Sequence, residues 1–259
     1  MMMDHTPSKL KVQYADATNL DARLALHERF SRHPTGWLSW LFDQYDFAPD
    51  SQILELGCGA AYQWKGNNRE RIDLSWRVTL TDFSVGMLTT AREATSDLDF
   101  TYANANAMSL PFPDASFDRI IANHMLYHVP DRPAACSEIA RVLRPGGKLF
   151  AGTNSNTSMA RLGELRKQAE PSTYTAAESP FSLENGPDQL APYFANVHVE
   201  PYDDGLDITE LDPLVAYVAS ARRMTESGLA RFAQICQDIL TREGVISIDK
   251  KGCLFICTV

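Results

Sequence analysis

The sequence lacks a cysteine framework. Its five cysteines, Cys58, Cys136, Cys236, Cys253 and Cys257, form no C-x-x-C pair and no zinc-type cluster with the six histidines. We therefore expect reduced thiols, no disulfide and no metal site, as is typical of a cytoplasmic protein.

Long apolar runs and a basic stripe are also absent. No stretch is long enough to span a bilayer, and the start, MMMDHTPSKLKV, has no hydrophobic core of the kind found in secretion signals. The net charge is -9, and the lysines and arginines are scattered singly, which disfavours extended contact with nucleic acid. A small-molecule partner, no nucleic acid and no membrane are expected, whereas the sequence does not indicate the oligomeric state.

Short β-type runs alternate with helical stretches along the 259 residues. This alternation predicts a single α/β domain: a doubly wound, seven-stranded, mostly parallel sheet. The expected strands are 52–56, 77–81, 99–103, 118–122, 147–152, 195–200 and 252–258.

Helical periodicity divides the chain into three parts. Two amphipathic helices, broken at His33-Pro34, form an N-terminal cap (1–49), and a compact cofactor-binding core follows (50–153). The core has helix candidates near 61–71, 84–95 and 131–143, and the turn Arg144-Pro145-Gly146-Gly147 closes the last of them. The substrate-side half (154–259) carries helical insertions, including two helical patterns in 206–245 before the last strand, where a specific pocket would be built.

A glycine turn follows the first strand, in the segment ILELGCGAA (53–61). A dinucleotide-binding turn has a third glycine, but here Tyr62 stands in that place. Glu55 would also lie close to the two phosphate charges of a dinucleotide, where like charges repel strongly. A nicotinamide cofactor therefore fits badly.

S-adenosylmethionine carries no phosphate, and its ammonium and sulfonium charges make an acidic residue beside this turn favourable. Gly57 and Gly59 would let the backbone approach the methionine part of that ligand. Asp82 closes the second strand, where a carboxylate can accept both ribose hydroxyls. After the third strand, the amide oxygen of Asn106 and a backbone N–H at Ala107 could read the adenine edge.

Four segments in order resemble the successive motifs of class I S-adenosylmethionine-dependent methyltransferases. They are ILELGCGAAYQW, LTDFSVGML, ANAMSLPFPDASFDRIIANHMLYHVPD and EIARVLRPGGKL. The resemblance covers about residues 50–152 and is closest to the small-molecule branch that includes the ubiquinone/menaquinone-type enzymes. It implies the Rossmann-like fold of that class, S-adenosyl-L-methionine as cofactor and S-adenosyl-L-homocysteine as product.

The resemblance also implies the cofactor contacts. The methionine end would lie at Glu55, Gly57, Cys58 and Gly59, with Asn123 beneath it; the ribose at Asp82; the adenine among Phe83, Met87, Asn106 and Ala107. Two positions depart from the family pattern. Ala61 replaces the last glycine of the first motif, and Asn106 replaces the usual aspartate, keeping an acceptor but losing the charge.

Other interpretations of single residues remain open. Glu55 could be an exposed carboxylate at a strand end, and Asp82 could be a helix N-cap. His124, Tyr127 and His128 lie where related enzymes place the acceptor, so a histidine there could act as general base. The alternative is that these three side chains only line or brace the pocket.

Two further segments have weaker signals. Glu184 and Asn185 precede a glycine turn and either contact substrate or cap a helix. Tyr14, Arg23 and Phe30 of the N-terminal cap could close over the cofactor as a lid.

The expected reaction is an in-line displacement that moves the methyl group to an O, N or C atom of a small acceptor. The alternatives are a methyltransferase acting on RNA or protein, a protein that binds the cofactor without transferring methyl, and, third, a nicotinamide oxidoreductase. The sequence identifies neither the acceptor nor the methylated atom.

Overall fold

The computed structural model describes residues 18–172, 178–221 and 223–259, and side chains from residue 24 onward. Seven strands form one sheet in the order β3-β2-β1-β4-β5-β7-β6. Neighbours from β3 to β5 pair in parallel, whereas β7 pairs antiparallel with both β5 and β6. The strands are β1 Gln52–Leu56, β2 Arg77–Asp82, β3 Thr101–Asn104, β4 Phe117–Ile121, β5 Leu143–Asn154, β6 Asn196–Ile208 and β7 Ile246–Thr258.

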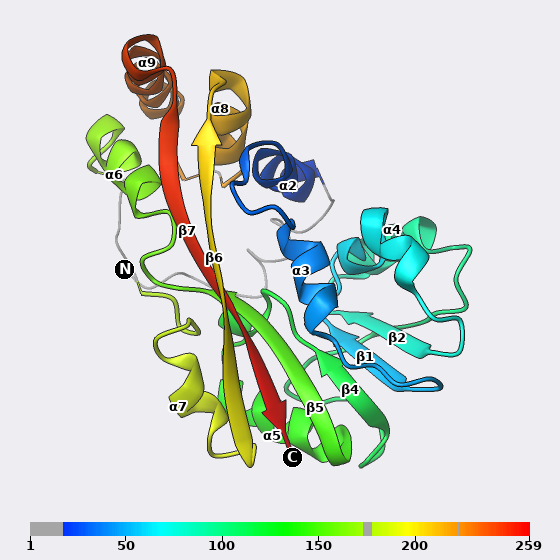
Figure 1. The fold of residues 1–259 in the computed structure, drawn as a ribbon. Helices are drawn as coiled ribbons and strands as arrows, with labels where there is room; N and C mark the ends of the chain where they lie inside the picture. The colour runs from blue at the N-terminus through cyan, green and yellow to red at the C-terminus, as the bar shows by residue number, and fades with distance from the viewer. Residues whose placement is uncertain (1–17, 173–177, 222) are drawn as a thin grey trace.

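Helices cover both faces of this sheet (Figure 1). This arrangement confirms the predicted mostly parallel, doubly wound α/β fold. The α-helices are α2 Thr18–Phe30, α3 Trp37–Gln44, α4 Val85–Ala94, α5 Arg132–Val142, α6 Ala160–Ala169, α7 Gly186–Leu190, α8 Leu211–Ser220 and α9 Glu226–Glu243; the 3-10 helices are η1 Tyr62–Trp64, η2 Gly66–Arg71 and η3 Leu126–His128.

Local sequence explains where several helices begin. Ser84 caps α4 by accepting a hydrogen bond from the Met87 N–H, and Asp131 caps α5 by accepting one from the Ala134 N–H. Thr225 caps α9 in the same way, and that helix ends at Gly244, whose φ of +76° suits glycine.

The helix expected near 61–71 was wrong in type. The chain makes two short 3-10 helices instead, because Lys65 is extended and Gly66 has a φ of +55°. The Asn68 amide donates one hydrogen bond to the Gln63 carbonyl oxygen, which the expected α-helix would have bonded internally, and another to the Leu38 carbonyl oxygen of α3.

Strands β6 and β7 are about twice as long as expected and extend beyond the rest of the sheet (Figure 1). Helices α2, α6, α8 and α9 pack around this extension. They form a second hydrophobic cluster, which includes Leu26, Phe30, Leu214, Phe232 and Ile248. We call this part of the molecule the upper lobe.

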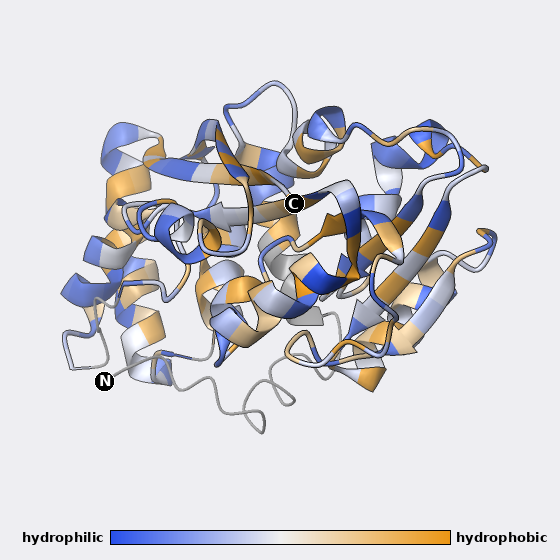
Figure 2. Ribbon diagram, turned by 90° about the horizontal axis from the view of Figure 1, so that it is seen from below, coloured by the Kyte–Doolittle hydropathy of each residue, from blue (hydrophilic) through white to orange (hydrophobic). Residues whose placement is uncertain are grey.

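The main core lies around the parallel strands. Leu54, Ile120, Leu149 and Phe255 are completely buried there between α5 and the sheet. Figure 2 shows hydrophobic residues gathered on the strands and the inward helix faces. This packing fixes the carboxyl ends of β1, β2 and β4, where the candidate site lies.

Of the three residues predicted to form a lid, the structure describes the side chain of Phe30 alone. Tyr14 lies outside the described residues, and the side chain of Arg23 is not described either. Phe30 is buried in the upper lobe. Within the described residues, no helix is both long and apolar enough to cross a membrane.

Candidate functional site

A cavity of about 560 Å³ opens at the carboxyl ends of β1, β2 and β4, beneath the upper lobe. Ligands of open α/β sheets bind in this crevice, and the volume lies within the range of roughly 300–1,000 Å³ typical of small-molecule sites. The structure brings every residue that the sequence suggested for cofactor binding or catalysis to the wall of this cavity. They are Glu55, Gly57, Cys58, Gly59, Asp82, Phe83, Met87, Asn106, Ala107, Asn123, His124, Tyr127 and His128.

The glycine turn is built from left-handed backbone. Gly57, Gly59 and Ala61 have φ values of +66°, +55° and +57°. A Cβ at Gly57 would lie 2.8 Å from the Cβ of Met125, so a side chain there requires a backbone shift. Ala61 accepts the conformation that favours glycine, at a cost of about 1–2 kcal/mol.

Glu55 is buried at the base of this turn, 4% exposed. Its Oε2 accepts a hydrogen bond of 2.5 Å from the Trp64 indole N–H. Burial raises the pKa of Glu55 to about 8; the Trp64 bond opposes this shift, and the Asp82 charge adds to it. The interpretation of Glu55 as an exposed strand-end carboxylate was therefore wrong, because the side chain is enclosed and lines the cavity.

Asp82 holds the turn and the next loop together. One carboxylate oxygen accepts a 3.0 Å hydrogen bond from the Gly59 N–H, and the other accepts a 2.7 Å bond from the Ser84 N–H. Burial raises its pKa, against the opposing effect of these backbone hydrogen bonds. The N-cap interpretation of Asp82 was wrong, because Ser84 is the cap of α4. The Phe83 N–H also bonds this carboxylate, which leaves it acceptor capacity for a ligand because a carboxylate has about four lone-pair sites.

The wall beyond Asp82 is mostly apolar. Phe83 is 47% exposed, whereas Met87 is buried. Asn106 closes the loop after β3 by accepting a 3.0 Å hydrogen bond from the Met108 N–H through its amide oxygen. The Asn106 NH₂ group and the second lone pair of its amide oxygen can both hydrogen-bond a ligand.

Asn123 braces the floor of the cavity. Its amide N–H donates to the Tyr45 hydroxyl at 2.8 Å, and its amide oxygen accepts from the Gly152 N–H at 3.2 Å. A Cβ at residue 152 would lie 2.8 Å from that oxygen. Asn123 thus joins the end of β4 to β5 and to the end of α3.

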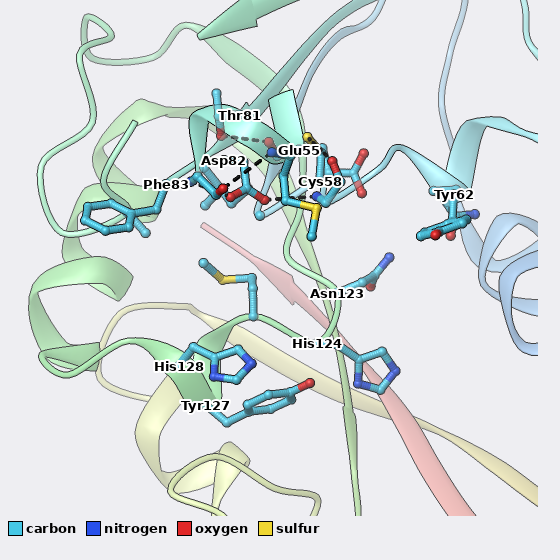
Figure 3. A pocket seen from close by; sticks show the side chains of 18 of the residues that line it. Glu55, Cys58, Tyr62, Thr81, Asp82, Phe83, Asn123, His124, Tyr127 and His128 are labelled. Atoms are coloured by element: carbon cyan, nitrogen blue, oxygen red, sulfur yellow. Dashed lines mark hydrogen bonds between the residues drawn. The ribbon is translucent and has the colours of Figure 1, made fainter. Parts of the chain in front are cut away.

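His124, Tyr127 and His128 lie on the side of the cavity opposite Glu55, Cys58 and Asp82 (Figure 3). His124 has a φ of +53°, and its ring packs against Trp37 with centroids 5.3 Å apart. Burial, followed by the positive charge of Lys250, lowers the pKa of His124 to about 4. A neutral imidazole with so low a pKa is a weak general base.

Glu184 and Asn185 serve the loops around them. Glu184 accepts hydrogen bonds from the Ser155 hydroxyl and the Asn156 N–H, and Asn185 accepts one from the Ser182 N–H. Neither residue is among the described residues that line the cavity.

Sequence reasoning missed the residues that the upper lobe contributes. Leu24 and His27 of α2, Tyr217 of α8 and Lys250 of β7 also line the cavity. Burial, then Lys250, lowers the pKa of His27 to about 3. A detectable signal existed for Lys250, because Ile246, Ile248 and Lys250 alternate on the buried face of β7 and a lysine there interrupts an apolar stripe.

Comparison with known proteins gives a domain match, two relatives and a structural neighbour. A model described as "Methyltransferase domain" matches residues 54–151. A demethylmenaquinone methyltransferase from Listeria monocytogenes is 39% identical over 102 residues, which are 38% of this chain and 43% of that protein. The match thus spans less than half of the length of that relative.

The demethylmenaquinone methyltransferase of Anoxybacillus flavithermus is 29% identical over 204 residues, 68% of this chain and 83% of its own. Among solved structures, phosphoethanolamine N-methyltransferase 2 of Haemonchus contortus, in complex with phosphomonomethylethanolamine and S-adenosylhomocysteine, superposes with a TM-score of 0.60 at 17% identity. That alignment covers 96% of this chain and 58% of the other. At this identity the structural likeness establishes the fold alone.

Proposed function

We propose that this chain is a class I S-adenosylmethionine-dependent methyltransferase, which transfers the methyl group of S-adenosylmethionine to a small-molecule acceptor. The match to a methyltransferase domain and the similarity to demethylmenaquinone methyltransferases support this proposal. The observation that carries this proposal is a pair of carboxyl groups beside a glycine turn, the buried Glu55 and the partly buried Asp82. A cationic nucleoside without phosphate stabilises the ionised form of both carboxyl groups, whereas a pyrophosphate beside them disfavours it.

The residues present fit this cofactor. Glu55 is a buried carboxyl group with one side-chain hydrogen-bond donor, Trp64, among the described residues, so it can pair with an ammonium or sulfonium charge. The space in front of Gly57 would be lost to any Cβ, which suits the methionine part of the ligand. Asp82 has acceptor capacity for the ribose hydroxyls, and Phe83 and Met87 offer an apolar surface to the adenine.

The cofactor, when bound, supplies a methyl group already activated by a positive sulfur. The chain then has to bind and align both molecules and exclude water. Glu55 and Asp82 would hold the donor, and Asn123 would keep the floor of the cavity rigid. His124, Tyr127 and His128 would face the acceptor, and the low pKa of His124 favours an alignment role for it over proton removal.

Binding is the first test. Thermal unfolding of the full chain with S-adenosylmethionine, S-adenosylhomocysteine or NAD should show stabilisation by the first two only, because a ligand bound by the native state alone raises the melting temperature. Stabilisation by NAD alone would reject the proposal.

The ribose assignment can be tested with one variant and a matched control. Asp82→Asn should weaken the binding of S-adenosylhomocysteine at least tenfold, about 1.4 kcal/mol, by calorimetry. Asp99→Asn removes an equal charge from an exposed position and should leave the affinity unchanged. Equal affinities for Asp82→Asn and the wild type would refute the ribose contact.

Turnover is the second test. Transfer of labelled methyl from S-adenosylmethionine should appear in the small-molecule fraction of a cell extract. Label in the RNA or protein fraction would point to a macromolecular acceptor, and cofactor binding without any transfer would favour a protein that only binds the ligand.

A further inference from the structure

The cavity has acidic side chains at one end and a basic side chain at the other. Glu55 and Asp82 lie at its glycine-turn end, and of the described residues that line it, Lys250 is the only lysine or arginine. Lys250 lies on β7, in the extended part of the strand that belongs to the upper lobe. If the acidic end holds the methyl donor, as proposed above, the cationic end faces the acceptor.

Lys250 is an unusual residue for its place. It is 8% exposed, and burial lowers its pKa despite the nearby Asp204. Burying an ammonium group is costly unless its three N–H donors have partners. Within the described part of the chain, its hydrogen-bond partner is Asp204, at the long distance of 3.5 Å.

Asp204 depends little on this lysine. It accepts hydrogen bonds from the Ser31 hydroxyl at 2.9 Å and from the backbone N–H groups of His33 and Gly205 at 3.0 and 2.6 Å. These bonds and the ion pair lower the pKa of Asp204 although burial opposes them. The ammonium therefore keeps capacity for a second anion, and the cavity is where that anion can lie.

The groups around Lys250 suit a flat molecule. His27 lines the cavity edge-on to Tyr217, with ring centroids 5.6 Å apart, and Trp37 packs beside His124. The His27 Nδ1 atom is buried and has no hydrogen-bond partner among the described residues. With pKa values of about 3 and 4, His27 and His124 are neutral at pH 7 and would remove a proton from a hydroxyl group poorly.

We propose that the half of the cavity lined by His27, His124 and Lys250 binds the methyl acceptor as an oxyanion on a flat apolar body, and that Lys250 selects it. The ligand class is a small carboxylate or phenolate. This inference deepens the proposed function and rests on it, because it assigns the second ligand of the same site.

Methyl transfer to an oxyanion needs no general base. A lone pair of the acceptor oxyanion forms the new O–CH₃ bond, the S–CH₃ bond breaks, and its electron pair stays on sulfur. One negative and one positive charge become two neutral groups, so no proton has to move. A reaction in which charges cancel is favoured in a dry, apolar cavity.

The same reasoning assigns Lys250 to binding. The negative charge that it contacts is largest in the ground state and decreases toward the transition state, so Lys250 should lower KM without raising kcat. Once an acceptor is in hand, Lys250→Met should raise its KM at least tenfold and change kcat by less than about threefold.

A binding experiment tests the inference without knowing the acceptor. The full chain is saturated with S-adenosylhomocysteine and titrated with benzoate and 4-nitrophenolate, and with benzamide and nitrobenzene as neutral counterparts of similar shape. We expect either anion or both to bind at least tenfold more tightly than the neutral counterpart. The pair that shows this preference distinguishes a carboxylate site from a phenolate site.

Variants give the decisive comparison. Lys250→Met should abolish the preference for the anion, whereas Lys251→Met, which removes the same charge from the exposed face of β7, should keep it. If Lys250→Met fails to fold, Lys250→Met combined with Asp204→Asn removes the buried pair as a neutral unit. The inference is overturned by equal binding of anions and neutral counterparts, by no binding of either anion, or by an anion preference that survives the loss of Lys250.

Failure of the proposed function has a different signature. Absence of S-adenosylhomocysteine binding to the wild type would reject the donor site, and the anion preference can still be measured on the chain alone. Normal S-adenosylhomocysteine binding with no anion preference would reject only the role of Lys250.

Discussion

Binding of a cationic cofactor should release a proton from Glu55. Burial raises the pKa of this carboxyl group from 4.5 to about 8, so it is mostly protonated at pH 7 in the free protein. An ammonium or sulfonium charge beside it favours the carboxylate and should lower that pKa well below 7. With a pKa of about 8, about 0.9 proton is bound at pH 7 before the ligand arrives, and nearly all of it should be released.

The same shift predicts how the free protein responds to pH. Since the folded pKa lies above the unfolded one, the stability that Glu55 contributes is present below pH 4.5 and is lost as the pH rises toward 8. Between pH 5 and pH 7 the loss amounts to about 2.5 kcal/mol at 1.36 kcal/mol per pKa unit. For a chain of this size that is on the order of 5–10 °C in melting temperature.

Glu55→Gln tests both consequences. The variant keeps an acceptor for the Trp64 indole but cannot titrate, so it should lack this pH dependence while other groups titrate as in the wild type. Thermal unfolding at pH 5 and pH 7 measures the difference between the two proteins. Calorimetry of S-adenosylmethionine binding at pH 7 in buffers with different ionisation enthalpies counts the released protons.

The comparison between the two proteins also removes an ambiguity. The amino group of the ligand titrates in the same pH range, but with an ordinary pKa of about 8 it is already about 0.9 protonated at pH 7 and can take up only about 0.1 proton on binding to either protein. A proton count that is the same for wild type and Glu55→Gln, or the same pH dependence of their melting temperatures, would refute the assignment of Glu55 to the cofactor cation.

Three further substitutions test the glycine turn and the hydrogen bond that Trp64 donates to Glu55. Gly57→Ala combines left-handed backbone strain with a collision against Met125, whereas Gly66→Ala has the strain with no atom within 4 Å of the new Cβ. By thermal unfolding, Gly66→Ala should lose about 1–2 kcal/mol of stability and Gly57→Ala should lose more, and only Gly57→Ala should weaken S-adenosylhomocysteine binding tenfold or more. Equal affinities for the two variants would contradict the close approach of ligand to this turn. Trp64→Phe removes the hydrogen bond to Glu55 and should cost about 1–3 kcal/mol and shift the pH dependence of stability upward, which unfolding at several pH values detects; an unchanged pH profile would show that the indole does not hold the carboxyl group.

The cofactor end of the cavity could be predicted from the sequence because its residues lie close together along the chain. Glu55, Gly57 and Gly59 lie within five residues of one another, and their chemistry depends on the turn that they themselves form. Asp82 is one strand away, and β1 pairs with β2 in parallel register, so the ends of the two strands meet at the same edge of the sheet. Periodicity and turn chemistry are enough to predict such an arrangement.

The upper lobe was harder to predict because its strands are polar in sequence. The segment from Asp203 to Asp207 and the segment from Asp249 to Lys251 have the composition of loops, yet they pair with each other in β6 and β7. Backbone pairing between distant segments overrides local propensity there. The 3-10 helices in 61–71 had a similar cause, since the side chain of Asn68 replaces helical backbone hydrogen bonds.

Lys250 shows why the acceptor end of the cavity could not be predicted from the sequence, whereas the cofactor end could. Its role depends on α2, on β4 and on the β6–β7 extension meeting around one cavity, and no two of these segments are neighbours in the chain. A buried ammonium and a buried carboxyl group at opposite ends of that cavity each oppose folding of the free chain. Such groups favour ligands that neutralise them, so the same two residues that weaken the free protein would give the bound complex its stability.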